Sequence, residues 1–278
     1  MASHRQPLRT SVRALLAPLG VAATLAAFQL LAGPASAMAA PNPQANMPIS
    51  SLPAACTSAP TGAICTNAVV VALDTARAEL GLGPYSLPAD FDSLSEAKQL
   101  LVLANLDRIA YGLPPIRGLS PTLASAAQVA MTNDLDPDPT ALLSGLNTYA
   151  WTANWAGQWP NAADAYYEWM YDDGYDGSET SNVDCTSATA SGCWVHRRNV
   201  LAIPTAGTLA MGASVGTDAK GHSSYTMTLV WTTSANWTSY SYTWAQAEAA
   251  GAGSTASAAR SHKAKPGVHV LGRGRRPT

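Results

Sequence analysis

The chain has 278 residues, of which 47% are hydrophobic and only 12% are charged. It is too apolar for a disordered protein and too polar for a protein with many membrane spans. The net charge of −2 gives no indication of nucleic-acid binding, and this length corresponds to one or two domains.

The charges are distributed unevenly along the chain. Residues 38–244 carry seven Lys/Arg against seventeen Asp/Glu, so this part is acidic. Both ends are basic, with three arginines in the first thirteen residues and six Lys/Arg in the last twenty. We therefore expect an acidic folded part between two basic ends.

Residues 1–37 have the pattern of a secretory signal peptide. Spaced arginines precede an apolar run over residues 14–32, and Ala-Ser-Ala at 35–37 is a small-residue cleavage pattern. A membrane anchor is the alternative, but Pro18 and Gln29 interrupt the run and make it a marginal span. The sequence predicts a cleaved, secreted protein, extracellular or associated with the cell wall, with no stable membrane span afterwards.

The four cysteines form two local pairs, Cys56 with Cys65 and Cys185 with Cys193. An even count in an exported chain indicates disulfides, and the pairing of neighbours is the simplest of three possibilities. Metal binding is the competing interpretation, but neither spacing is C-x2-C. We interpret residues 38–90 as an N-terminal extension with a short disulfide loop.

Helical signals come first in the chain and strand signals last. Residues 66–80 have a helical composition, a capping box at Ser93–Glu96 predicts a second helix, and Ser120-Pro121 predicts the start of a third that runs to about Asn133. A further helix is expected from near Asn161. Strands are expected at Thr208–Val215 and Tyr225–Thr233, joined by a turn near 218–221.

This order of elements predicts an α+β domain over residues 91–244. The chain beyond that point is rich in Ala, Gly and Ser and then basic, so residues 245–278 are expected to form a disordered basic tail.

Several motifs, in a fixed order, resemble a known family. Residues 105–115 (NLDRIAYGLPP), Trp169-Met-Tyr-Asp172 and residues 192–201 (GCWVHRRNVL) are followed by a strand with Met211-Gly212. This set is similar to the CAP superfamily (cysteine-rich secretory, antigen 5 and pathogenesis-related-1 proteins), in its bacterial secreted SCP-domain form. The resemblance covers about residues 91–235 and implies a three-layer α-β-α sandwich.

Many members of that family have a cleft with two His and two acidic residues, which can bind a divalent metal. The match places His196 on the second histidine and Asp172 on the acid of a Trp-x-x-Glu helix. The family's Gly-Glu-Asn motif corresponds here to Ala153-Asn154, so the first acid is missing. The first histidine should lie in the helix 120–133, where Asn133 is the nearest polar residue. With two of four groups absent, we expect neither a metal nor a cofactor, and His196 and Asp172 are only weak candidates for metal ligands.

The remaining cleft candidates are Glu168 and Asn154. Glu168 and Asp172 are four residues apart on one helix and can share a face with His196. A structural His bonded to nearby backbone is the alternative for His196. We expect a monomeric, non-enzymatic extracellular binding or interaction module whose partner is an unknown ligand or cell-surface polymer.

Two other function classes stay open. One is an extracellular hydrolase that uses His196 with Asp172 or Glu168. The other is a glycan-binding module in which Trp151, Trp155 and Trp159 present aromatic faces, although packing in the core is the preferred interpretation.

Three further motif matches are set aside. Gly212-Ala-Ser-Val-Gly216 fits G-x-S-x-G, but a turn and a strand follow instead of a helix. Gly192-Cys-Trp194 is an incomplete cysteine-protease pattern. The D-x-D-x-D run at 134–138 lacks the Gly and Glu of an EF-hand loop. A separate group of acidic residues at 172–184 is interpreted as a solvated loop, with calcium binding as the alternative.

Overall fold

The computed structural model describes residues 54–146, 149–175, 184–203, 207–233 and 239–254. The expected signal peptide and the last 24 residues lie outside these ranges. Within them, no helix combines the length and the apolar character that a membrane crossing needs.

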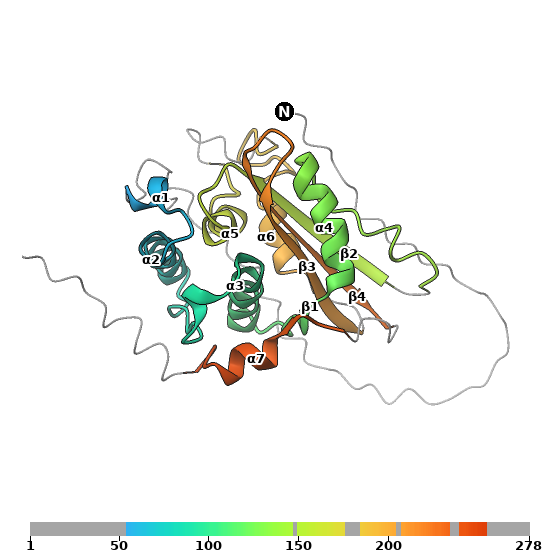
Figure 1. Cartoon of the computed structure of the whole chain (residues 1–278), viewed down its shortest axis with the longest axis horizontal. Helices are drawn as coiled ribbons and strands as arrows, with labels where there is room; N and C mark the ends of the chain where they lie inside the picture. The colour runs from blue at the N-terminus through green and yellow to red at the C-terminus, as the bar shows by residue number, and fades with distance from the viewer. Residues whose placement is uncertain (1–53, 147–148, 176–183, 204–206, 234–238, 255–278) are drawn as a thin grey trace, which may run out of the picture.

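A mixed five-stranded sheet, ordered β2-β4-β3-β1-β5, lies at the centre (Figure 1). Antiparallel pairs join β2 with β4, β4 with β3, and β1 with β5, whereas β1 and β3 run parallel. The strands are β1 Gly118–Leu119, β2 Tyr149–Gly157, β3 Thr208–Thr217, β4 Ser223–Thr232 and β5 Tyr242–Thr243. The predicted hairpin of β3 and β4 is confirmed, and β2 is an unpredicted strand that pairs with β4 along its whole length.

The helices are α1 Ala55–Ser58, α2 Ala63–Glu79, α3 Glu96–Ala110, α4 Pro121–Asn133, α5 Ala162–Tyr171, α6 Val195–Val200 and α7 Trp244–Ala249, with a 3-10 turn at Phe91–Ser93. The start of α4 is as predicted, because the Ser120 hydroxyl accepts the Leu123 N–H and Pro121 occupies the first turn. The predicted capping box at Ser93–Glu96 is wrong. Ser95 is the N-cap of α3 without a side-chain bond, and Glu96 instead accepts the Ala162 N–H at the start of α5.

Helices cover the sheet on different sides (Figure 1). On one face, α4 approaches β3 so closely that a side chain at Gly212 would collide with Leu123. On the same face, the hydroxyls of Ser224 and Thr226 donate to carbonyls of α4. Alternate residues of β3 and β4 enter the main apolar core with α2, α3 and α5. The α+β class is confirmed, and the three-layer sandwich of the resembled family stays an expectation.

A buried polar cluster joins α2 to this core. The Asp107 carboxylate on α3 pairs with the Arg77 guanidinium of α2 and accepts the hydroxyls of Tyr85, Tyr166 and Tyr171. Because Asp107 is fully buried, these donors replace the water that its charge would otherwise bind. Residues 54–90, described above as an extension, therefore share the core of residues 91–244.

Both predicted disulfides are present. Cys56–Cys65 links α1 to α2, with Cα atoms 4.8 Å apart. Cys185–Cys193, with Cα atoms 4.5 Å apart, closes the loop that leads into α6. The cysteine spacing therefore predicted the pairing correctly.

The expected start of the disordered tail at Ala245 is wrong. Residues 245–254 are ordered, with a capping box between Thr243 and Gln246 at the start of α7. Ala247 and Ala252 are buried in the core, and the Gly253 N–H donates to the Ser86 carbonyl. Small residues pack closely here, so the Ala/Gly-rich composition did not indicate disorder. Residues 255–278 lie outside the described residues.

Candidate functional site

His196 lies in the first turn of α6, against the chain that leaves α5. Its ring Nδ1 is 2.7 Å from one oxygen of Asp173, and its backbone N–H donates to the other oxygen at 2.7 Å. The His196 side chain is 20% exposed, whereas that of Asp173 is 1% exposed. One buried carboxylate therefore fixes both the backbone and the ring of His196, and the ring keeps some contact with solvent.

A strained backbone precedes this pair. Trp194, the residue before α6, has a left-handed conformation with φ of 60°, which is unusual for a bulky residue. Its N–H donates to the Asp173 carbonyl at 2.7 Å, and a side chain at Gly174 would overlap its indole ring. The disulfide Cys185–Cys193 ends one residue earlier. These constraints hold the start of α6 against residues 173 and 174.

The rest of the HRRNVL motif supports α6. The buried Arg197 donates to the Met170 carbonyl of α5. Asn199 donates to the Ala153 carbonyl and to the Asn154 side chain of β2. Asn154, a predicted site residue, is fully buried and donates to the His196 carbonyl at 3.1 Å, so it positions the helix rather than facing a ligand.

Two further acidic residues, which lie on other parts of the chain, raise the pKa of His196. Glu168 on α5 is almost fully buried, and Trp159 donates to one of its oxygens. Asp136 follows α4 and accepts a backbone hydrogen bond from Trp155. The second oxygens, Glu168 Oε2 and Asp136 Oδ1, have no partner among the described residues.

The pKa values of these groups move in the same direction. Burial raises the pKa of Glu168 well above its usual value, and the positive charge of His196 opposes this rise. Burial also raises the pKa of Asp136. For His196, burial opposes the charged form, but Asp173, Asp136 and Glu168 outweigh it and raise the pKa to about 9. The site therefore contains an imidazolium that is charged at neutral pH and is stabilised by the neighbouring carboxylates.

Three of these positions differ from the expectation drawn from the sequence. The carboxylate bonded to His196 is Asp173, next to the expected Asp172, which is buried at the end of α5. Asn133 is exposed and donates to Val129 on its own helix, so it does not replace the missing histidine. Asp136, three residues later, is the group after α4 that acts on His196, and it was considered only as part of a calcium pattern.

Other patterns in the sequence do not form sites. Ser214 donates to Gln128 beneath α4, whereas His222 pairs with Asp218 in the β3–β4 turn at 3.2 Å, so they form no catalytic triad. Cys193 is consumed by its disulfide. In the described part of the chain, no three His, Cys, Asp or Glu side chains are arranged to hold a metal ion.

The three tryptophans proposed as a glycan platform are all partly buried. Trp151 packs with Leu123 and Val230, Trp159 packs on the main core, and the Trp155 indole N–H donates to Ser224 at 2.9 Å. They are therefore not a row of exposed aromatic faces.

Comparison with known proteins finds no relative: no family model, no curated protein and no solved structure matches this chain.

Proposed function

We propose that this chain is an exported, CAP-like binding module in which His196, charged at neutral pH, is a hydrogen-bond donor to an extracellular ligand. The observation that carries the proposal is the double contact of Asp173 with the ring and the backbone of His196, at 2.7 Å each. The order of the motifs supports the family assignment. The two disulfides and the signal pattern support export.

A charged His196 is suited to binding and poorly suited to base catalysis. A general base must be neutral at the working pH, and a metal ligand must be neutral as well. With a pKa of about 9, the ring is protonated at pH 7. A charged donor favours a ligand that presents acceptor oxygens, such as a carboxylate or phosphate of a cell-surface polymer.

The proposal is tested by co-sedimentation of the exported chain with purified bacterial cell walls. At pH 7, we expect His196→Gln to weaken retention about tenfold, because a hydrogen bond to a charged group is lost. His222→Gln is the matched control, since His222 also pairs with an aspartate but lies in the exposed β3–β4 turn. In the wild type, retention should fall as the pH rises through 9. Equal retention of the two variants would overturn the proposal.

A hydrolase is the second candidate, favoured by one observation. Glu168 is a buried carboxyl group that favours its protonated form and has one oxygen without a partner, which are properties of a general acid. Chromogenic ester, peptide and glycan substrates test it. Turnover that disappears in both His196→Gln and Glu168→Gln would replace the binding proposal, and no turnover would leave binding as the function.

A further inference from the structure

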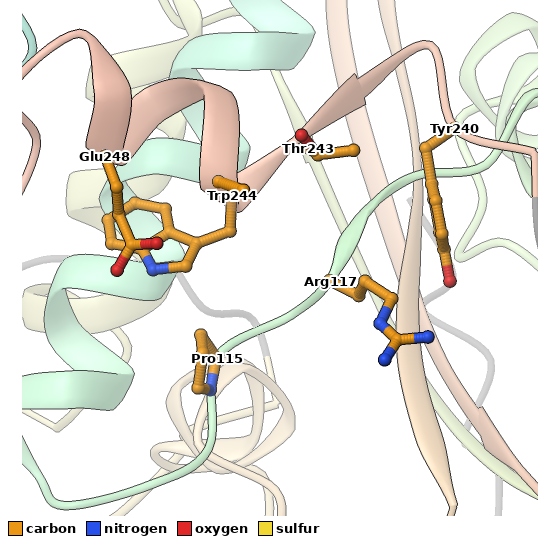
Figure 2. A pocket seen from close by; sticks show the side chains of 7 residues that line it. Pro115, Arg117, Tyr240, Thr243, Trp244 and Glu248 are labelled. Atoms are coloured by element: carbon orange, nitrogen blue, oxygen red, sulfur yellow. The ribbon is translucent and has the colours of Figure 1, made fainter.

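A hollow lies where β1, β5 and α7 meet, and the His196 site contributes none of its lining residues (Figure 2). Its volume is about 360 Å³, enough for a small polar molecule. Figure 2 shows Trp244 and Glu248 of α7 on one side of the hollow and Arg117 with Tyr240 on the other. Pro115, Thr243 and Ala245 complete the lining.

The indole of Trp244 forms an apolar wall of the hollow. Trp244 is only 5% exposed, and its Nε1 atom is buried without a hydrogen-bond partner within the described structure. Because this atom is shielded from solvent, a ligand in the hollow contacts the ring surface of Trp244 and not its N–H.

The charges around the hollow narrow the class of ligand. Arg117 and Glu248 are both exposed and carry opposite charges, so a simple anion would meet Glu248 and a simple cation would meet Arg117. A fitting ligand accepts hydrogen bonds from Arg117 and donates one to Glu248. It also presents apolar surface to Trp244, Pro115 and Tyr240.

We propose that this hollow is a saccharide-binding site. Each sugar hydroxyl both donates and accepts hydrogen bonds, and the C–H faces of a sugar ring pack on aromatic and proline surfaces. An uncharged ring therefore satisfies both charged side chains at the same time. The site is independent of His196, so either assignment can be correct without the other.

The experiment is a titration of the exported chain with the β-1,4-linked trimer of N-acetylglucosamine, followed by the indole N–H signals in ¹⁵N-correlated NMR spectra. Trp244→Phe assigns the signal of the pocket. Trp231→Phe assigns the matched control, because Trp231 Nε1 on β4 also lacks a partner but lies outside the hollow. Sodium acetate and ammonium chloride are titrated in parallel as the ionic alternatives.

We expect a saturable shift of the Trp244 signal with the sugar and none of the Trp231 signal. Arg117→Gln and Glu248→Gln, both at exposed positions, should each weaken binding about tenfold and leave the fold intact. Affinity should be the same at low and high salt, since the ligand is uncharged. The proposal is overturned if the sugar leaves the Trp244 signal in place, or if acetate or ammonium shifts it and the sugar does not.

Discussion

Asp164, in the first turn of α5, is fully buried, and neither of its carboxylate oxygens has a partner among the described residues. Burial raises its pKa from 3.8 to about 7. A carboxyl group with a raised pKa favours the folded state below its unfolded pKa, and this contribution is lost as the pH rises toward 7. Ionised Asp164 therefore weakens the protein at neutral and alkaline pH.

Replacing Asp164 with Asn should remove this cost. We expect Asp164→Asn to raise the free energy of unfolding by about 2 kcal/mol at pH 8 and to change it little at pH 4, measured by urea denaturation. Asp138→Asn, on an exposed loop, is the control and should show no such dependence on pH. An equal effect of Asp164→Asn at both pH values would show that Asp164 is not buried in its neutral form.

Some residues of the His196 site could be predicted from the sequence, and others could not. His196 was identified from its motif, and the structure gives that motif a physical role through Arg197 and Asn199. The choice between the adjacent Asp172 and Asp173 depends on how the chain leaves α5, which no local pattern specifies. Asp136 was not connected to His196 because the two are brought together only by the tertiary fold.

At the scale of elements, the helices and strands that could be predicted are those that depend on residues close in the sequence. The Ser120-Pro121 start of α4 and the hairpin of β3 and β4 depend on residues close in the sequence, and both were identified. β2 was not predicted, because its strand conformation depends on pairing with β4, which is distant in the sequence. α7 was missed because its stability comes from packing of small residues against distant parts of the chain.

The disulfide Cys185–Cys193 should stabilise the loop before α6 and with it the site. Changing both cysteines to Ser should lower the free energy of unfolding by about 2–3 kcal/mol, because a closed loop restricts the unfolded chain. The same change at Cys56 and Cys65 is the control, since it opens a loop of similar length far along the sequence from His196. We expect both pairs to affect stability in urea denaturation, but only the first to weaken retention on cell walls. Equal retention by the two variants would show that the disulfide does not support the site.

At the scale of the whole molecule, the opposite charges of the folded part and the C-terminal end suggest a second mode of attachment. Residues 255–278 carry six Lys/Arg and no acidic residue, beside a strongly acidic folded part. Such a segment is attracted to anionic polymers, and this attraction is screened within about 10 Å near 0.1 M salt. Retention on teichoic-acid-containing walls should therefore decrease steeply with salt.

Truncation after Ser254 preserves α7 and removes only this basic segment. We expect the truncated chain to lose the salt-dependent part of its retention and to keep the part that depends on His196. If the truncated chain is retained as well as the whole chain at low salt, the basic segment is not an attachment site.

The central claim is that Asp173 keeps His196 charged, and a pH titration of the His196 ring signals by NMR tests it most directly. The wild type should titrate with a pKa of about 9, because Asp173, Asp136 and Glu168 outweigh the effect of burial. In Asp173→Asn the strongest of these contributions is lost, and the pKa should fall by more than one unit, toward the usual value for histidine. A wild-type pKa at or below 6.5, or no change in Asp173→Asn, would contradict the account, because His196 would then be neutral at physiological pH and available as a base.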